Sequence, residues 1–148
     1  MNHTCIDSTM AELYRMVSVH LLGAYPEVDV LDGPSIDDIG QDVVAIGISA
    51  EDMSAESSFE YAGLETDRET FDLVCLVRSW TGDPELGPRR ARAFAIFRSI
   101  ADLIKADPRL GGTCARARIA GISYTPARLP EGAIASLTFR VRIEAFTS

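Results

Sequence analysis

Hydrophobic residues recur along the chain with two different periods, one typical of helices and one typical of strands. Near the N-terminus they are spaced three and four positions apart, which predicts a helix from about Thr9 to Leu22. Its stripe consists of Met10, Leu13, Tyr14, Val17 and Leu21. Ser8 or Thr9 can cap this helix, Glu12 completes a capping box with Thr9, and Gly23 ends it.

A second stripe with helical spacing lies in the later half of the chain. It consists of Phe94, Phe97, Ile100, Ala101 and Ile104. Pro88 suits the first turn of this helix, where its missing N–H costs nothing. The helix is expected to end at Asp107-Pro108, because a residue before proline is disfavoured in the α region.

The strand period of two appears in several other segments. Phe71–Trp80 is apolar on both sides and is predicted to be the central strand of a sheet. Asp42–Ser49 is rich in β-branched residues and is predicted to be a buried strand, whereas Glu27–Val30 alternates over a shorter length. Cys114–Thr125 and Leu137–Phe146 alternate and are close enough for an antiparallel hairpin.

The middle of the chain is dominated by acidic residues. We interpret the stretch from about residue 50 to residue 69 as a long loop that includes an edge strand around Ser58–Ala62. Long loops in compact domains are usually functional or disordered. The expected fold is therefore α+β, with a mostly antiparallel sheet and two helices packed on one face, and residues 1–148 form a single domain.

Charge is distributed unevenly between the two halves. The net charge of −8 argues against a protein that binds nucleic acid through phosphate contacts. Residues 1–70 contain 15 acids and 2 arginines, a net of −13, whereas residues 71–148 contain 7 acids and 12 lysines or arginines, a net of +5. This asymmetry either reflects two solvated faces or makes neighbouring copies complementary to each other.

No motif for catalysis or metal binding is recognised. The cysteines, Cys5, Cys75 and Cys114, are widely spaced and accompanied by only two histidines, His3 and His20, so a zinc site is not expected. No glycine-rich phosphate loop or nucleophile elbow occurs, and the acidic doublets lie in turn-rich segments. We therefore expect a protein without enzymatic activity or cofactor. No membrane helix or secretory signal is recognised, so synthesis in a cytoplasm is expected.

Two strands near the C-terminus carry arginines at alternate positions. Because the strands are expected to be neighbours, the arginines should share one face of the sheet. They are Arg116, Arg118, Arg140 and Arg142. Three interpretations remain open: a salt-bridging surface for an acidic neighbour, a nucleic-acid surface, or ordinary surface arginines.

In the second half of the chain, a strand that ends in Trp is followed by a Gly-Asp loop, a helix that opens with Arg and Ala, and an Asp-Pro-x-Leu-Gly turn. The residues of this pattern are Ser79, Trp80, Gly82, Asp83, Arg90, Ala91, Arg92, Ala93, Asp107, Pro108, Leu110 and Gly111. The pattern resembles the small tail-terminator and tail-completion proteins of long-tailed, siphovirus-like actinobacterial phages. The resemblance covers residues 70–146 well and residues 1–69 only in layout.

This resemblance implies a structural virion protein that caps the tail tube as a homo-oligomeric ring, expected to be a hexamer. The ring would end tube polymerisation and form the tail side of the head–tail junction. Its partners would be other copies of itself, the major tail tube protein and a head-completion or connector protein, while genomic DNA passes through the lumen without specific binding. The protein would be assembled in the host cytoplasm, and in the virion it would lie at the head-proximal end of the tail.

The arginines on the two C-terminal strands and the acids of the middle segment are the candidate interface residues. The acids are Glu51, Asp52, Glu56, Glu60 and Glu65. Two alternatives remain: a head-completion or connector ring subunit of the same virion, and a small cytoplasmic ligand-binding or enzymatic α+β domain.

Overall fold

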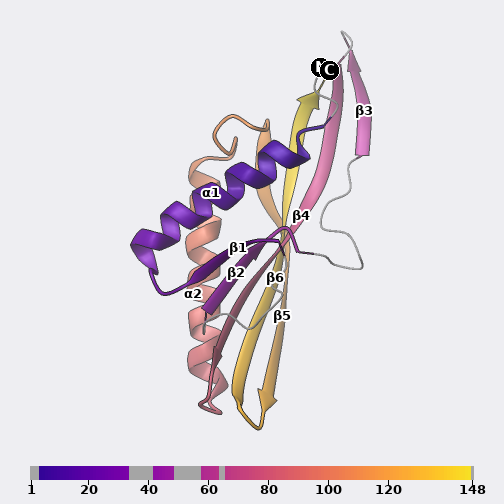
Figure 1. Cartoon of the computed structure of the whole chain (residues 1–148). Coiled ribbons are helices and arrows are strands. Elements are labelled where there is room, and N and C mark those ends of the chain that lie inside the picture. The colour runs from indigo at the N-terminus through magenta and orange to yellow at the C-terminus, as the bar shows by residue number, and fades with distance from the viewer. Residues whose placement is uncertain (1–3, 34–41, 49–57, 64–65, 148) are drawn as a thin grey trace.

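A computed structural model of the chain describes residues 4–33, 42–48, 58–63 and 66–147. Within these described ranges, two helices and a six-stranded sheet make up the fold (Figure 1). The elements are α1 (Ile6–Ala24), β1 (Asp29–Asp32), β2 (Asp42–Ile46), β3 (Ser58–Gly63), β4 (Thr66–Thr81), α2 (Leu86–Ala106), β5 (Arg116–Leu129) and β6 (Gly132–Thr147). The predicted α+β class, with two helices on one face of a mostly antiparallel sheet, is confirmed.

The sheet follows the order β1-β2-β4-β6-β5, and β3 also pairs with β4. All pairs are antiparallel except β1 with β2. One edge of β4 is shared by β3, which pairs with its first half, and β2, which pairs with its second half. Along its other edge β4 pairs with β6 from Asp67 to Thr81. The predicted central strand is therefore central, and it begins five residues before Phe71.

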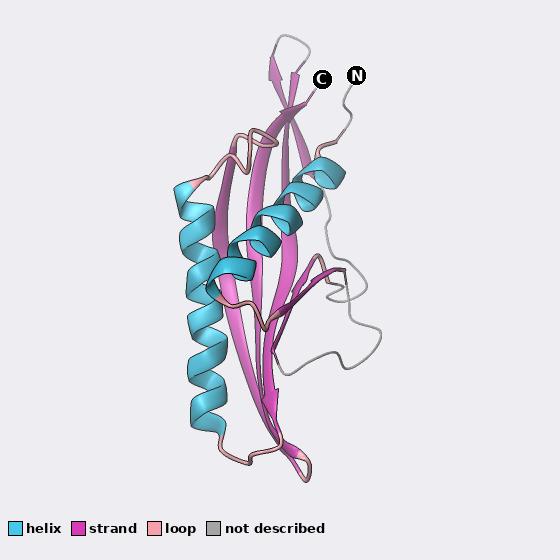
Figure 2. Ribbon diagram, turned by 60° about the vertical axis from the view of Figure 1, so that its left-hand side comes forward, coloured by secondary structure: helices cyan, strands magenta, loops and turns pink. Residues whose placement is uncertain are grey.

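Both helices cover the same face of the sheet, as Figure 2 shows. The side chains between them form one core cluster, whose members on β4 and β6 include Leu73, Cys75, Leu137 and Phe139. The ring of Phe97 on α2 meets that of Phe139 edge-on, with 5.2 Å between the ring centres. The apolar stripes of the two helices and the alternate residues of the strands therefore meet in one layer.

The start of α1 differs from the prediction. The helix begins at Ile6, three residues before Thr9, and Thr9 is buried, with its Oγ1 donating to the Thr113 carbonyl at 3.4 Å. Glu12 does not close a capping box but pairs with Arg15. The first N–H groups of a helix need outside acceptors. Here the buried carboxylate of Glu69 on β4 accepts the backbone N–H of Cys5 at 2.8 Å.

The second helix also begins slightly earlier than Pro88, at Leu86, so that proline occupies the third helical position. This is compatible with the helix because the first four N–H groups have no intrahelical acceptor. The predicted end near Asp107 is confirmed, since Ala106 is the last helical residue.

A β-bulge between Ile119 and Gly121 changes the faces of β5. The sequence pattern put Gly121 on the side of Ala117 and put Ile122 on the side of the arginines. The pairing puts Gly121 opposite Arg140 and Ile122 opposite the core residue Phe139, so this part of the prediction was wrong. A bulge adds one residue to one strand, which reverses the alternation beyond it. The strand also continues to Leu129, which shortens the predicted link to a tight turn.

The predicted edge strand around Ser58–Ala62 is confirmed as β3. The first four residues of β4, 66–69, belong to the segment that the sequence pattern placed in the acidic loop. The remainder of that loop lies outside the described residues. In Figure 1, β3 and the neighbouring end of β4 extend beyond the helices at one end of the molecule. No described helix is long and apolar enough to span a membrane.

Candidate functional site on the open face of the sheet

The sheet face opposite the helices, here called the open face, carries the four predicted arginines. Arg118 lies opposite Arg142 across β5 and β6, and Arg116 lies opposite Glu144. Arg140 lies two residues from Arg142 on β6 and therefore points to the same side. The expectation that these arginines share one face is confirmed by the pairing, whereas their role in an interface stays a prediction.

Acidic side chains on the same face neutralise part of this charge. Arg142 donates to both carboxylate oxygens of Asp72 on β4, from Nε at 2.9 Å and from Nη2 at 3.2 Å. The hydrogen bond to Asp72 is the main reason that the pKa of the Arg142 guanidinium is raised. Arg68 and Glu144 form a second, longer ion pair at 3.6 Å. The surface of β4 and β6 is therefore locally balanced around these two ion pairs.

The excess positive charge is concentrated toward β5. Arg116, Arg118 and Arg140 are exposed and form no ion pair with any residue that the structure describes. Two of these three arginines belong to β5, which is the last strand of the sheet at this edge. The available basic surface is therefore an edge rather than the whole face.

The predicted acidic partners are placed only in part. Glu51, Asp52, Glu56 and Glu65 lie outside the described residues, as do the doublets Asp37-Asp38 and Glu51-Asp52. Glu60 lies on β3, is exposed and pairs with Arg68 across the ladder, which places it on the open face. Because β3 borders β4 on the side away from β6, Glu60 and the β5 arginines are at opposite edges of the sheet. The chain does not bring them together within one copy.

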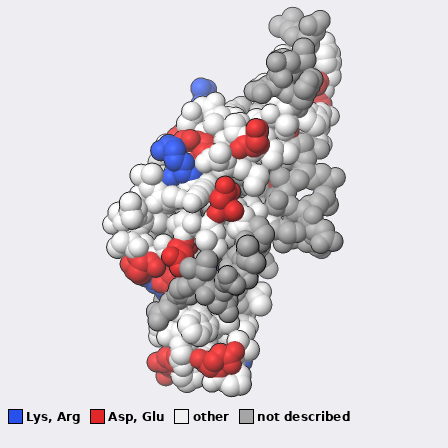
Figure 3. All heavy atoms as spheres, viewed as in Figure 1, with Lys and Arg blue, Asp and Glu red and all other residues white. Residues whose placement is uncertain are grey.

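Acidic side chains are also spread over the face that carries α1, where few basic ones are visible (Figure 3). This view agrees with the negative first half of the sequence. The molecule therefore presents a mostly acidic surface around α1 and an exposed basic edge at β5.

A polar cluster that sequence reasoning missed lies on the helix side, where β2, β4 and α2 meet. Asp42 is buried, accepts Ser79 Oγ–H at 2.6 Å with Oδ1, and accepts Arg92 Nε–H at 3.0 Å with Oδ2. Arg89 donates to Ser79 Oγ at 3.0 Å. Arg92 also pairs with Glu27 and lies over the ring of Tyr25, 4.7 Å from its centre. The cluster joins the first turns of α2 to the sheet and to the segment after α1.

Several residues of the phage-like sequence pattern are explained by this cluster and by the turns around α2. Ser79 and Arg92 belong to the cluster, and Asp83 accepts the Glu85 N–H at 2.9 Å just before the helix. After the helix, Asp107 accepts the Gly111 N–H at 3.0 Å, and Leu110 is buried with a positive φ of 46°. These residues shape the framework. In the sequence, the only sign of the cluster is that Ser79 and Arg92 are among the residues that match the phage-like pattern.

The strongest sign of catalytic chemistry is a contact between His20 on α1 and Ser99 on α2. Their side chains approach to 2.6 Å between Nε2 and Oγ. A Ser–His pair acts as a nucleophile when a third group orients the histidine and donors surround the reacting atom. No described residue forms a hydrogen bond with the other ring nitrogen, and neither His20 nor Ser99 lines the two hollows described below. The contact is best explained as a hydrogen bond between two packed helices.

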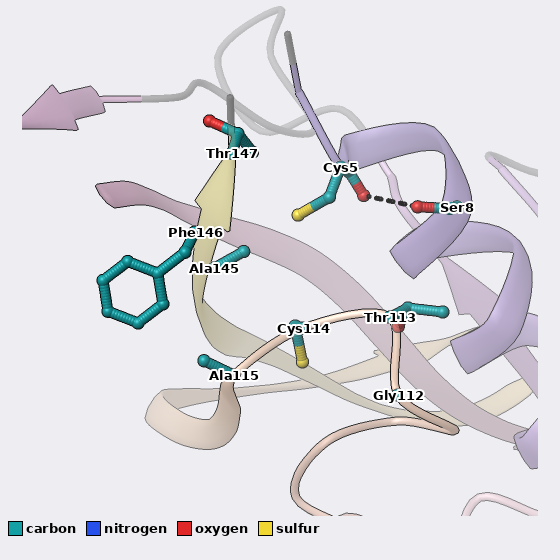
Figure 4. A pocket seen from close by; sticks show the side chains of 9 residues that line it. All are labelled: Cys5, Ser8, Gly112, Thr113, Cys114, Ala115, Ala145, Phe146 and Thr147. Atoms are coloured by element: carbon teal, nitrogen blue, oxygen red, sulfur yellow. Dashed lines mark hydrogen bonds between the residues drawn. The ribbon is translucent and has the colours of Figure 1, made fainter. Parts of the chain in front are cut away.

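Two of the hollows in the surface are lined by described residues alone. One of about 390 Å³ lies at the start of α1 and is lined by Cys5 and Cys114, with Phe146 on its outer side (Figure 4). Burial is the main cause that raises the pKa of both thiols, that of Cys114 to about 11. Thiolate is therefore scarce at neutral pH, and these groups are poor nucleophiles. Among the described residues, no group of three or more His, Cys, Asp or Glu side chains could hold a metal.

The other hollow, of about 510 Å³, lies between the end of α2 and the start of β5 and is here called the α2–β5 groove. Its apolar residues are Ala101, Ile104, Pro108, Ala117 and Ile119. Its basic residues are Lys105, Arg116 and Arg118, so the groove adjoins the basic edge described above.

Comparison with known proteins gives one coarse result. No family model matches the chain, and no curated protein matches it in sequence. Among solved structures, it is similar to a chain described as "Virion of native gene transfer agent (GTA) particle". The TM-score is 0.41 and the identity is 15%, with 92% of this chain and 94% of that chain covered. At this low identity and TM-score, the chain is similar in structure to a component of a virion particle.

Proposed function

We propose that this chain is a structural virion protein that caps a phage tail tube as a ring and forms the tail side of the head–tail junction. The observation that carries the proposal is the sequence pattern from Ser79 to Gly111, which resembles tail-terminator proteins. Ser79 and Arg92 of that pattern belong to the buried cluster, and other residues of the pattern form the turns before and after α2. What resembles the phage proteins is therefore the framework of the fold rather than a reactive site.

The surface properties agree with a ring subunit. An exposed basic edge and a mostly acidic surface around α1 favour head-to-tail contacts between copies, which close into rings when the rotation allows it. A net charge of −8 would disfavour adhesion of DNA to the ring as it passes through the lumen. Residues 1–148 act as one domain in this proposal, and no cofactor takes part.

Immunogold electron microscopy of virions from the virus that carries this gene tests the proposal directly. An antibody against the chain is expected to label the head-proximal end of the tail, and deletion of the gene is expected to give tails of uncontrolled length that do not join heads. Label under the portal, with tails of normal length in the deletion, would support the head-completion alternative instead. An absence of the chain from purified virions would overturn the structural role itself.

A further inference from the structure

Strand β3 carries two large aromatic side chains that are not covered by any described part of the chain. Phe59 is 51% exposed and Tyr61 is 74% exposed. They lie opposite Glu69 and Asp67 of β4, on the side of the sheet that faces the helices. Glu60, between them, points to the open face. One side of β3 is therefore aromatic and the other is acidic.

The start of β5 offers the complementary arrangement. On the helix side, Ala117 and Ile119 form part of the apolar lining of the α2–β5 groove. On the open face, Arg116 and Arg118 are exposed and have no described ion-pair partner. This edge is thus apolar on the side where β3 is aromatic, and basic on the side where β3 is acidic.

The two strands lie at opposite edges of the sheet and extend in opposite directions from one shared level. Ser58 on β3 pairs with Thr70 on β4, Thr70 pairs with Glu144 on β6, and Glu144 pairs with Arg116 on β5. Among the described strands, none pairs with the outer edge of β3 or with that of β5. Three successive antiparallel pairings also make β3 and β5 antiparallel to each other. A neighbouring copy that is displaced along the strand direction, so that its β3 lies beside the first residues of β5, would therefore continue the sheet in antiparallel order.

We propose that β3 of one copy docks along the free edge of β5 of the next copy. Phe59 and Tyr61 then enter the α2–β5 groove, and Glu60 faces Arg116 and Arg118. This deepens the proposed function and rests on it, because a ring subunit needs two different surfaces that fit each other. Unpaired strand edges are ready sites for such addition, with side-chain pockets supplying specificity.

The occupant is identified as a second copy because all three requirements of the groove are met by one strand of this chain. An apolar hollow takes aromatic side chains, a basic rim takes a carboxylate, and a free strand edge takes another strand. Within one copy the contact is excluded, because β4 and β6 separate β3 from β5. Continuation of the sheet also keeps each side chain on its own face.

Photo-crosslinking with the full chain tests this contact. Tyr61→p-benzoylphenylalanine keeps an aromatic ring at an exposed position, so the fold should tolerate it. A mixture of isotopically light and heavy copies is irradiated at the highest soluble concentration, and virions assembled with the variant are irradiated in parallel. Mass spectrometry is expected to find light–heavy crosslinks from position 61 to residues 101–119. Phe146→p-benzoylphenylalanine is the matched control, because Phe146 is 61% exposed but lies on the open face.

The outcomes separate this inference from the proposed function. Crosslinks from position 61 to other regions, crosslinks within one copy only, or none in either preparation would overturn the contact. If the chain is nonetheless found at the tail end of virions, the ring role stands with a different interface. If the chain is absent from virions but the 61-to-groove crosslinks form between copies, the contact stands and the virion role fails.

Discussion

The carboxylate of Glu69 accepts the backbone N–H of Cys5 with Oε1 at 2.8 Å, although the two residues are 64 positions apart. Its other oxygen accepts the hydroxyl of Thr4 at 2.5 Å. Strand β4 thus supplies an acceptor for one of the backbone N–H groups that have no partner at the start of α1. The negative charge of Glu69 also interacts favourably with the positive end of the helix dipole. The first helix is tied to the sheet at the end of the molecule that carries β3.

Removal of this acceptor should weaken the fold. Glu69→Ala is expected to lower the free energy of unfolding by about 2 kcal/mol, because a buried N–H and a hydroxyl lose their partner. Urea denaturation followed by circular dichroism measures the change. Asp67→Ala is the matched control on the same strand and face, and its exposed carboxylate should cost less than about 0.5 kcal/mol. Equal losses in the two variants would contradict a special role for Glu69.

Asp42 should be the most sensitive residue of the buried cluster. Asp42→Ala is expected to destabilise the protein by about 3 kcal/mol, because Ser79, Arg89 and Arg92 lose a shared acceptor in a partly buried site. Asp102→Ala, an exposed carboxylate on α2, should be nearly neutral. A double-mutant cycle with Ser79→Ala should give a coupling energy of at least about 1 kcal/mol, and strict additivity would argue against a connected cluster.

Burial of the cysteines predicts a loss of stability at alkaline pH. The pKa of Cys75 is raised from 9.0 to about 12, so the unfolded chain releases this proton at lower pH than the folded chain does. The stabilisation is complete below about pH 9 and is lost as the pH rises toward 12. Urea titrations above pH 9 measure how the free energy of unfolding falls with pH. This fall should be steeper in the wild type than in Cys75→Ala, by up to about 1.4 kcal/mol per pH unit.

The same burial predicts slow thiol chemistry. Cys75 should react with a thiol reagent at neutral pH only after the chain is unfolded, because the thiolate is both rare and inaccessible. Identical pH slopes for the wild type and Cys75→Ala, or rapid labelling of Cys75 in the folded protein, would show that this thiol is not held as described.

Two glycines should respond to alanine in opposite directions. Gly132 has a φ of 147°, and a Cβ there would lie 1.9 Å from the Thr81 carbonyl oxygen, so Gly132→Ala should cost at least about 2 kcal/mol. Gly87 lies in the first turn of α2 with open space around it, so Gly87→Ala should stabilise by up to about 1 kcal/mol. Thermal unfolding measures the stability of both variants against the wild type. A Gly132→Ala variant as stable as the wild type would contradict the close approach of Gly132 to Thr81.

A charge exchange tests the proposed contact between copies by a route independent of crosslinking. Glu60→Arg and Arg118→Glu should each weaken self-association about tenfold, because like charges then face each other across the contact. The double variant should recover most of the loss. Arg140→Glu, on the open face but one strand inside the edge, should change association little. Sedimentation velocity measures all four, and a double variant as weak as the singles would remove Glu60 and Arg118 from a shared interface.

The periodicity of hydrophobic residues was sufficient to predict the type and order of the helices and strands, because their apolar sides all pack into one core layer. It could not predict the start of α1, since the capping carboxylate of Glu69 is contributed by a distant strand. The bulge at Ile119–Gly121 was also hidden, because the local pattern continues to alternate through it. The shared face of the four arginines followed from alternation alone. The ion pair between Arg142 and Asp72 depended on strand order, which the sequence pattern does not specify.

The ladder between β4 and β6 has a mechanical consequence. These strands are joined over fifteen consecutive residue pairs without a break in register. A pull along the strands would stretch the hydrogen bonds of this ladder together in shear, whereas a pull on β5 would peel its bonds from the edge one after another. The centre of the sheet is therefore built to carry load along the strand direction, whereas an edge strand such as β5 would yield to an outward force by peeling.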